Sequence, residues 1–460
     1  MALMLDTIIV GGGVAGLTAA WDLDRAGHKV LVLEAASEIG GNVRTMERDD
    51  FRMERGPHSF LSSADHVWRL VEELGLDHQV EEAAPVASNR YILRGGRLHA
   101  LPLSAGAFLG TRLLSFGAKA RLTMEPFIRP GGTADDTAWE FFVRRFGEEA
   151  AAWIMSPFIS GIYAGDIHAL GARAAFPKFW GFEQESGSMI RGAMRYMKEK
   201  KRRLVAEGKA PRKGLFTIYR GIGGLTTTLG VRLSQKILAD IPVQTITQGD
   251  GCVRVSWAGG EAKARSVVVA APPPRASAML AEVAPGAADA LDEIPLVQVA
   301  VIHWSPIQED VGPWPAGFGA LIPRQEGLRV LGTLFPSQLF EGRAPAGRRL
   351  FTSYYGGALD PDAATLPDEG LLAVVREEHT TMFGFDPGPL DRIEVLRYEH
   401  AIPQLLPGHP EVVSRLRTAA GRVPGLFLAG NYLTGVGIEN AVESGYQAAG
   451  EVKHWLEATS

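Results

Sequence analysis

The chain of 460 residues contains a single cysteine, Cys252. One thiol cannot form an intramolecular disulfide, an iron–sulfur cluster or a cysteine-rich zinc site, and this scarcity favours a reducing compartment. Long apolar runs are also missing, because the nearest approach, residues 101–118, is interrupted by Pro102, Arg112 and three glycines. We therefore expect no spanning helix. The N-terminus lacks the basic region of a secretory signal, so we expect a cytoplasmic location.

A large excess of charge of one sign is also missing. The formal net charge is −5, from 47 Lys and Arg against 52 Asp and Glu. No basic footprint for nucleic acid is present, and we assign no nucleic-acid partner and no metal site. A hydrophobic content of 46% with 54 glycines is typical of a folded α/β protein. The length exceeds that of one ordinary core, so two or three domains are expected.

The N-terminal residues follow the pattern of a nucleotide-binding βαβ unit. A β-branched run at residues 7–10 enters Gly11-Gly12-Gly13-Val14-Ala15-Gly16, and an Ala-rich segment leads to a second apolar run that ends at Glu34. The first glycine permits a tight turn, the third lets backbone amides approach a pyrophosphate, and the last permits close helix–strand packing. Glu34 can accept hydrogen bonds from ribose hydroxyls. Ordinary turn glycines are the competing interpretation.

A second glycine pair narrows the choice of nucleotide. Gly40-Gly41-Asn42-Val43-Arg44 follows Glu34 closely. This arrangement resembles the extended FAD fingerprint of the amine-oxidase superfamily and is not expected in a nicotinamide dehydrogenase. The alternative is a simple Gly-Gly turn with a solvated arginine.

Flavin-type segments recur along the chain, which indicates a discontinuous α/β fold. We predict a Rossmann-like FAD-binding domain from residues 1–90, 216–285 and 421–460. Residues 91–215 read as a mainly helical insertion, and residues 286–420 as a β-rich substrate-binding insertion with strands near 297–303, 350–355 and 393–398.

The end of the helical insertion is strongly basic. Such a segment can lie on an anionic membrane, which would place the protein on the inner face of the cell membrane. The competing interpretation is a solvated face or a loose loop. The basic residues are Arg191, Arg195, Lys198, Lys200, Lys201, Arg202, Arg203, Lys209, Arg212 and Lys213.

Several motifs together resemble one family, the oxygen-dependent protoporphyrinogen oxidases, including their bacterial coproporphyrinogen-oxidising relatives. The order of these motifs along the chain is that of the family. The sequence departs from the family pattern at Leu405, where an aromatic residue is expected, at Asn440, near which a small residue is common, and at Tyr354, where an aliphatic or Met side chain is common. The motifs are Gly56-Pro57-His58-Ser59-Phe60, Asn89-Arg90-Tyr91, Gly161-Ile162-Tyr163-Ala164-Gly165-Asp166, Gly317-Phe318-Gly319, Ile402-Pro403-Gln404, Gly430-Asn431 and Gly435-Val436-Gly437-Ile438.

The resemblance implies six-electron oxidation of a porphyrinogen by FAD, with dioxygen as acceptor and hydrogen peroxide released. It implies that Arg90 pairs with a substrate propionate and that Phe318, Leu321 and Tyr354 line the macrocycle. FAD is expected to be noncovalent, because no cysteine lies near the C-terminal flavin segment. We assign no catalytic acid or base. The residues assigned to the flavin are Gly11, Gly12, Gly13, Val14, Ala15, Gly16, Glu34, Ala35, Gly41, Asn42, Arg44, Gly56, Pro57, His58, Ser59, Val243, Asn431, Val436, Gly437 and Ile438.

Three questions stay open at this level. The preferred substrate is protoporphyrinogen IX, with coproporphyrinogen III as the alternative, because the number of anchored propionates cannot be read from the sequence. A flavin oxidase acting on amines or polyenes and a flavin-binding protein without turnover are further alternatives. The oligomeric state, a homodimer included, is also undetermined.

Overall fold

The computed structural model describes residues 4–206, 212–249, 251–308 and 311–459. A seven-stranded sheet contains the N-terminal strand and is ordered β10-β2-β1-β13-β12-β11, with β19 paired to β13. Its parallel strands are β10 (Ile237–Leu238), β2 (Val30–Leu33), β1 (Leu5–Val10), β13 (Gly260–Val269) and β19 (Leu426–Leu428). The antiparallel strands β11 (Val243–Gly249) and β12 (Cys252–Trp257) extend one edge.

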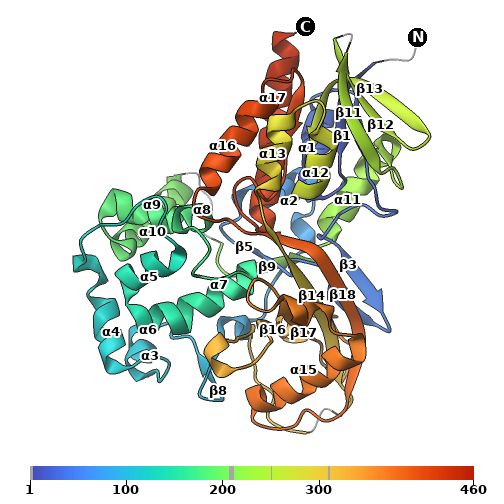
Figure 1. Ribbon diagram of the computed structural model, residues 1–460. Helices are drawn as coiled ribbons and strands as arrows, with labels where there is room; N and C mark the ends of the chain where they lie inside the picture. The colour runs from blue at the N-terminus through green and yellow to red at the C-terminus, as the bar shows by residue number, and fades with distance from the viewer. Residues whose placement is uncertain (1–3, 207–211, 250, 309–310, 460) are drawn as a thin grey trace.

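Helices cover both faces of this first sheet (Figure 1). Ile9 packs toward one layer, while its neighbours Ile8 and Val10 pack toward the other. A strand buried on both faces needs a continuous apolar run, which explains the run at residues 7–10. The first layer contains α1 (Val14–Arg25), α2 (Asp65–Leu74), α11 (Gly224–Arg232) and α17 (Ile438–Ala458). The second contains α12 (Pro273–Leu280), α13 (Pro285–Asp292) and α16 (His409–Ala420).

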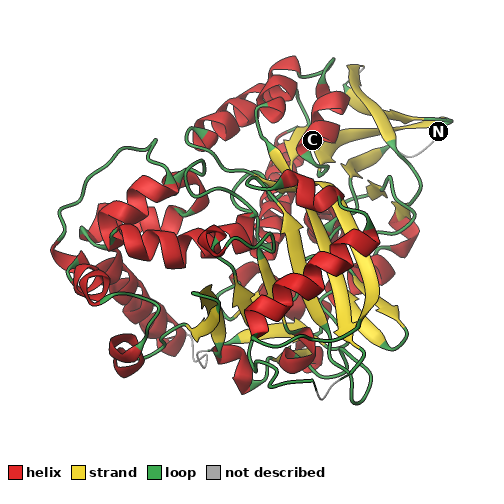
Figure 2. Cartoon of the chain, turned by 60° about the horizontal axis from the view of Figure 1, so that its bottom comes forward, coloured by secondary structure: helices red, strands yellow, loops and turns green. Residues whose placement is uncertain are grey.

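A second seven-stranded sheet follows the order β18-β14-β17-β16-β15-β7-β8. The three strands predicted near 297–303, 350–355 and 393–398 are its β14, β17 and β18. One face packs against α15 (Asp368–Phe383), and Figure 2 shows a helix lying across these strands. The strands are β18 (Leu390–Pro403), β14 (Leu296–Pro306), β17 (Phe351–Gly356), β16 (Gly332–Leu334), β15 (Gly319–Leu321), β7 (Arg90–Arg94) and β8 (Arg97–Ala100).

The segment after residue 100 is mainly helical, as expected, although residues 91–100 belong to the second sheet. Its core is rich in aromatic side chains, among them Phe141, Phe142 and Phe176. Of the basic residues predicted for this region, Lys209 lies outside the described residues. Within the described ranges, no helix is both long and apolar enough to cross a membrane. The longer helices here are α3 (Ala105–Gly110), α4 (Phe116–Thr123), α5 (Ala138–Phe146), α7 (Ser156–Tyr163), α9 (Pro177–Ser186) and α10 (Met189–Ala206).

Short elements complete the fold. A three-stranded sheet of β5, β9 and β6 adjoins the first layer of helices, and a hairpin of β3 and β4 packs against Leu350 and Ile393 beside the second sheet. They are β3 (Thr45–Arg48), β4 (Phe51–Glu54), β5 (Phe60–Leu61), β6 (Val80–Glu82) and β9 (Leu215–Ile218), with the short helices α6 (Glu148–Ala150), α8 (Ala172–Ala175) and α14 (Pro336–Leu339).

Candidate active site

The glycine-rich loop joins β1 to α1 and leaves space at one position only. A side chain at Gly11, where φ is +111°, would lie 2.7 Å from the carbonyl oxygen of Ala270. At Gly16 it would collide with the carbonyl oxygen of Gly11. At Gly13, by contrast, a Cβ atom would meet nothing within 4 Å. The loop is therefore tight on the protein side and open beside the N-terminus of α1, where unpaired amides and the helix dipole favour an anion.

Glu34 fixes this loop from the end of β2. Its carboxylate accepts hydrogen bonds from the backbone amides of Gly12 at 2.5 Å and Ala36 at 2.8 Å. Two acceptor positions of the carboxylate remain for ribose hydroxyls. The amide of Ile241 donates to the carbonyl of Glu34, and this contact brings the start of β11, including Val243, to the same edge.

The second glycine pair lies directly against the first motif. The amide of Gly40 donates to the carbonyl of Gly12 at 2.7 Å, and a Cβ atom on Gly41 would lie 3.3 Å from Cα of Gly13. Arg44 forms an ion pair with Glu38, and burial is the main cause that lowers its pKa. Two motifs that are separate in the sequence thus form one surface, as the FAD fingerprint predicts.

The next segment connects that surface to the second sheet. A Cβ atom on Gly56 would lie 2.5 Å from the carbonyl oxygen of Asn42, the residue that follows the glycine pair. Residues 56–59 therefore begin directly beside that pair. His58 is buried, and its Nε2 lies 2.9 Å from the hydroxyl of Tyr354 on β17. Burial, with the nearby His303 and Arg343, holds the pKa of His58 well below its ordinary value of 6.5. His58 is therefore neutral.

The C-terminal segment approaches the same region. Gly437 caps α17, and further along this helix Gly445 allows it to pack against the first turn of α1, since a Cβ atom there would meet the carbonyl oxygen of Ala15. Val436 packs against the aromatic core of the helical region. Within the described residues, the buried hydroxyl of Thr434 has no hydrogen-bond partner. This orphaned polar atom and the open space at Gly13 both fit a bound dinucleotide.

Three of the four predicted substrate residues lie on strands of the second sheet, Arg90 on β7, Leu321 on β15 and Tyr354 on β17, and Phe318 directly precedes β15. Arg90 and Phe318 are adjacent, with the guanidinium carbon 5.1 Å from the ring centroid. Leu321 pairs with Gly332, and Gly332 pairs with Tyr354, so these three share one face of the sheet.

Two contacts refine this arrangement. The tip of Leu321 reaches α7, where a Cβ atom on Gly161 would collide with it. Phe318 instead packs with Ala87, Leu339 and Phe340. The predicted substrate residues therefore form two neighbouring pairs rather than one continuous cluster.

Sequence reasoning missed a buried ionic network beside His58. Arg343 donates to Glu54 at 2.5 Å, and Glu54 also accepts from the hydroxyl of Thr45 and the amide of Ile222. Burial raises the pKa of Glu54 despite the neighbouring guanidinium. These residues come from distant segments without a local motif, so no sequence pattern could have joined them.

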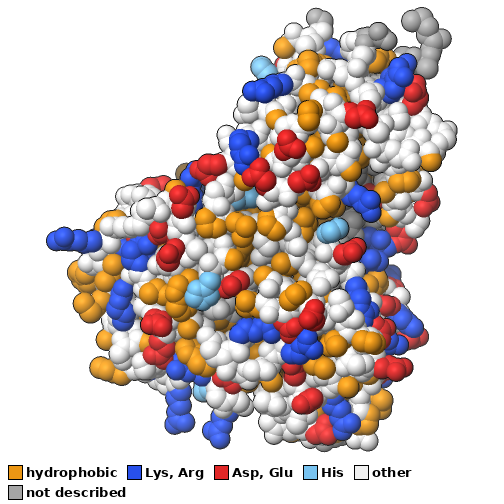
Figure 3. Space-filling model, viewed as in Figure 1, with side chains coloured by type: hydrophobic (Ala, Val, Ile, Leu, Met, Phe, Trp, Pro, Cys, Tyr) orange, Lys and Arg blue, Asp and Glu red, His pale blue; other side chains and the backbone are white. Residues whose placement is uncertain are grey.

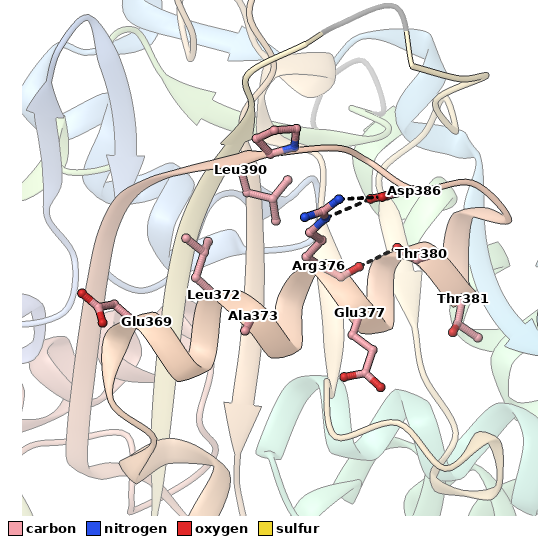
Figure 4. Close-up of a pocket in the computed structure, with 10 residues that line it drawn as sticks. Glu369, Leu372, Ala373, Arg376, Glu377, Thr380, Thr381, Asp386 and Leu390 are labelled. Atoms are coloured by element: carbon pink, nitrogen blue, oxygen red, sulfur yellow. Dashed lines mark hydrogen bonds and ion pairs between the residues drawn. The ribbon is translucent and has the colours of Figure 1, made fainter.

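A surface pocket elsewhere contains none of the predicted residues. It lies between α15 and the residues after it, and Figure 4 shows the ion pair between Arg376 and Asp386 at its edge. Since α15 covers the opposite face of the sheet from Tyr354, this pocket is separate from the flavin segments. We assign it no role in the chemistry.

Comparison with known proteins places these features in a family. The pattern of the family described as flavin containing amine oxidoreductase matches residues 14–453. The chain belongs to this family. It is 32% identical to the chloroplastic protoporphyrinogen oxidase of Nicotiana tabacum, over 98% of this chain and 86% of the relative. It is 29% identical to the coproporphyrinogen III oxidase of Bacillus subtilis, over 98% of both chains.

Solved structures agree with this membership. A putative protoporphyrinogen oxidase from Exiguobacterium sp. 255-15 superposes with a TM-score of 0.81 at 25% identity, over 98% of this chain and 99% of that chain. Cyclohexylamine oxidase from Brevibacterium oxydans, at 16% identity and a TM-score of 0.70, shares the fold alone. The family resemblance inferred from the motifs is confirmed. The protein is a flavoenzyme, and its cofactor is FAD.

Proposed function

We propose that this flavin oxidoreductase oxidises a porphyrinogen to the corresponding porphyrin, with protoporphyrinogen IX as the substrate and dioxygen as the final acceptor. Bound FAD supplies the redox chemistry, because it accepts two electrons in each of three cycles and passes them to dioxygen as hydrogen peroxide. The net reaction is porphyrinogen plus three dioxygen to porphyrin plus three hydrogen peroxide. It serves the biosynthesis of haem.

One observation carries the proposal. Residues assigned to the cofactor and residues assigned to the substrate adjoin one another. The backbone of Gly41 lies close to Gly13, that of Gly56 lies close to Asn42, and His58, two residues after Gly56, bonds Tyr354. Leu321 lies on the same face of the sheet, one strand beyond Gly332. A redox enzyme needs this adjacency, since the substrate must contact the flavin for electron transfer.

The proposed substrate contacts follow from its shape. A flat apolar macrocycle needs apolar walls and a few polar anchors at its rim. Leu321 and Phe318 supply apolar surface, and the exposed guanidinium of Arg90 can bind a propionate with two parallel hydrogen bonds.

Coproporphyrinogen III is the second candidate substrate. The Bacillus subtilis relative, which is named for this substrate, aligns over 98% of both chains. The two porphyrinogens differ in the number of propionates, so the side chains that face the rim, Arg90 among them, decide the preference.

An anaerobic titration tests the proposed function. Either porphyrinogen should bleach the yellow flavin absorbance, and admission of air should restore it while porphyrin fluorescence remains. Primary amines and polyenes serve as parallel arms. Bleaching by an amine or polyene and not by either porphyrinogen would assign the protein to another flavin oxidase, and no bleaching by any of them would favour a binding protein without turnover.

We also infer a division into three units. Residues 1–90, 216–285 and 421–460 would form the discontinuous FAD-binding domain, interrupted by a mainly helical unit of residues 91–215, whose first ten residues join the second sheet, and by a β-rich unit of residues 286–420. The first sheet supports this division, because it takes strands from all three segments of the proposed FAD-binding domain.

We further propose that the helical region rests on the surface of an anionic membrane at the cytoplasmic side. Several large apolar side chains of this region are exposed, including Leu109 at 73%, Phe116 at 87% and Phe127 at 77%. Figure 3 shows apolar side chains gathered along the edge of the molecule formed by these helices. Arg191 lies 5.9 Å above the ring of Phe127, so cationic and apolar groups stand side by side. That combination suits an interfacial helix.

Sedimentation with lipid vesicles tests this placement. The protein should pellet with anionic vesicles, and about 0.5 M salt should release much of it because exposed charges are screened. The double variant Phe116→Ser/Phe127→Ser should pellet poorly, while Leu359→Ser, which changes an exposed leucine on another surface, should behave as the wild type. Equal binding of all three proteins, or equal binding to neutral vesicles, would support the solvated-face interpretation.

A further inference from the structure

A buried histidine and a partly buried tyrosine meet where the flavin segments contact the second sheet. His58 comes from the loop after β4, and Tyr354 comes from β17, yet Nε2 of His58 and the hydroxyl of Tyr354 are 2.9 Å apart. The apolar cluster around Tyr354 includes Val301 and Leu396. The hydrogen bond offsets the cost of placing these polar groups in apolar surroundings, and it ties the flavin segments to the second sheet.

Other ionisable groups surround this pair. From β14, His303 bonds the hydroxyl of Thr352 through Nδ1 at 2.9 Å. Its Nε2 has no partner among the described residues. From β4 and the segment after α14 come Glu54 and Arg343, which neutralise each other as a buried ion pair.

Tyr398 lies in the same apolar cluster and donates its hydroxyl to the carbonyl of Arg55 at 2.7 Å. Burial raises the pKa of Tyr354 and lowers that of His58, so both partners are neutral at neutral pH. In this state the phenol can donate its proton to Nε2, while a lone pair of its oxygen stays available.

The position of Tyr354 makes its oxygen accessible to a substrate on this face. Its cross-strand neighbour on β16 is Gly332, which carries no side chain, and the next residue across is Leu321. The tip of Leu321 lies over this glycine, because a Cβ atom on Gly332 would be 3.2 Å from Cδ2 of Leu321, so Leu321 and Tyr354 adjoin on one face of the sheet. Because Tyr354 is only partly buried, a flat ring that contacts Leu321 on this face would also meet the side chain of Tyr354.

We propose that Tyr354 and His58 form the proton relay of the porphyrinogen oxidation, with Tyr354 contacting the substrate and His58 acting through it. This inference rests on the proposed function. Bound FAD would accept the hydride of each cycle, and the protein would accept the accompanying proton: the oxygen of Tyr354 would take it from the substrate while its own proton passes to Nε2 of His58. Dioxygen would later take the two electrons together with the hydrogen of the hydride, and the proton held at His58 would return through Tyr354 as the second hydrogen of hydrogen peroxide. Electrons and protons thus balance in every cycle.

Substitution of the phenol by a phenyl ring is the sharpest test. Tyr354→Phe keeps the ring and removes only the oxygen, and Tyr398→Phe is a matched control in the same cluster. We expect the rate of anaerobic flavin reduction to fall by about a hundredfold in Tyr354→Phe, the lower range for acid–base catalysis, and to change less than about threefold in Tyr398→Phe. The flavin content and the Kd for the porphyrin product, measured by fluorescence without turnover, should stay within about twofold.

A second variant tests His58. In His58→Ala, added imidazole should raise the rate of anaerobic flavin reduction at least about tenfold above that of the variant alone, because a small base can occupy the vacated space. A purely structural role predicts no such rescue. If His58→Ala does not retain flavin, the pair of tyrosine variants decides the question alone.

The outcomes distinguish the relay from the reaction. Normal porphyrin formation by the wild type with an unchanged flavin-reduction rate in Tyr354→Phe would overturn the relay alone. So would a loss confined to KM, because that loss would assign Tyr354 only a lining role. No porphyrin formation by the wild type would overturn the proposed function, and the relay with it.

Discussion

Replacing Gly13 by valine should yield folded protein without flavin. The backbone at Gly13 has φ −71° and ψ 172°, an extended conformation that valine adopts readily. Because a Cβ atom there would meet nothing within 4 Å, the protein itself accommodates the side chain. The same open space lies at the N-terminus of α1, where the pyrophosphate of FAD is expected to bind.

The expected size of the effect follows from mass action. A ligand present at about a hundred times its Kd stabilises the folded state by about 2.7 kcal/mol, so the variant should lose about that much relative to the flavin-loaded wild type. Its thermal unfolding should coincide with that of wild-type protein stripped of flavin. The flavin content, read from absorbance after denaturation, should fall from about one per chain to below about a tenth.

Two further substitutions separate this effect from general damage. Gly106→Val also enters open space but lies in α3, so its flavin content should equal that of the wild type. Gly16→Val should fail to fold, because its side chain collides with the carbonyl of Gly11. Full flavin content in Gly13→Val would refute the placement of the pyrophosphate.

Three other changes give independent checks. Arg90→Ala should raise KM by about one to two orders of magnitude, from a lost charged hydrogen bond of roughly 1.5–3 kcal/mol, and Arg90→Lys should rescue it only in part; steady-state kinetics with unchanged KM would exclude the anchor role. Arg343→Met should lower the free energy of urea unfolding by about 3–5 kcal/mol, because Glu54 would be left buried without its partner, and adding Glu54→Gln should recover part of the loss; an unchanged unfolding midpoint would contradict this. Burial lowers the pKa of His303 to about 3 and of His379 to about 4. The unfolded chain therefore binds more protons than the folded chain below about pH 6.5, and the free energy of unfolding should fall by about 1 kcal/mol per histidine between pH 6.5 and 5.5. Replacing His379 by Gln should flatten this pH dependence, and an equally steep dependence in the variant would contradict the lowered pKa of His379.

The cofactor surface could be predicted from the sequence because its chemistry is local. The spacing of Gly11, Gly13 and Gly16 encodes a turn, an open position and a close contact within one βαβ unit, and each has the predicted consequence in the structure. The meeting of Gly40 with Gly12 was accessible in the same way, because only α1 and β2 separate the two glycine motifs, and the parallel pairing of β1 with β2 brings both motifs to the same edge of the sheet.

The substrate face was only partly predictable. Arg90 and Phe318 were assigned through family resemblance, and their pairing depends on a parallel contact between β7 and β15. The boundary at residue 90 overlooked β7 and β8, because a short hairpin turning at Gly95 and Gly96 was included in the helical insertion.

The polar network was out of reach of sequence reasoning. Glu54, His303 and Arg343 come from three distant segments, and no spacing rule relates them. His58 showed its partner only once β17 was placed, since the bond to Tyr354 spans most of the chain.

Product stoichiometry under air tests whether the protein oxidises a porphyrinogen with dioxygen as the acceptor. Purified enzyme should be supplied with protoporphyrinogen IX and, in parallel, with coproporphyrinogen III, while porphyrin fluorescence, oxygen uptake and hydrogen peroxide are recorded together. The account predicts three dioxygen consumed and three hydrogen peroxide released for each porphyrin formed, with protoporphyrinogen IX showing the higher kcat/KM. Porphyrin formation no faster than in enzyme-free buffer, for both substrates and with flavin fully bound, would contradict it.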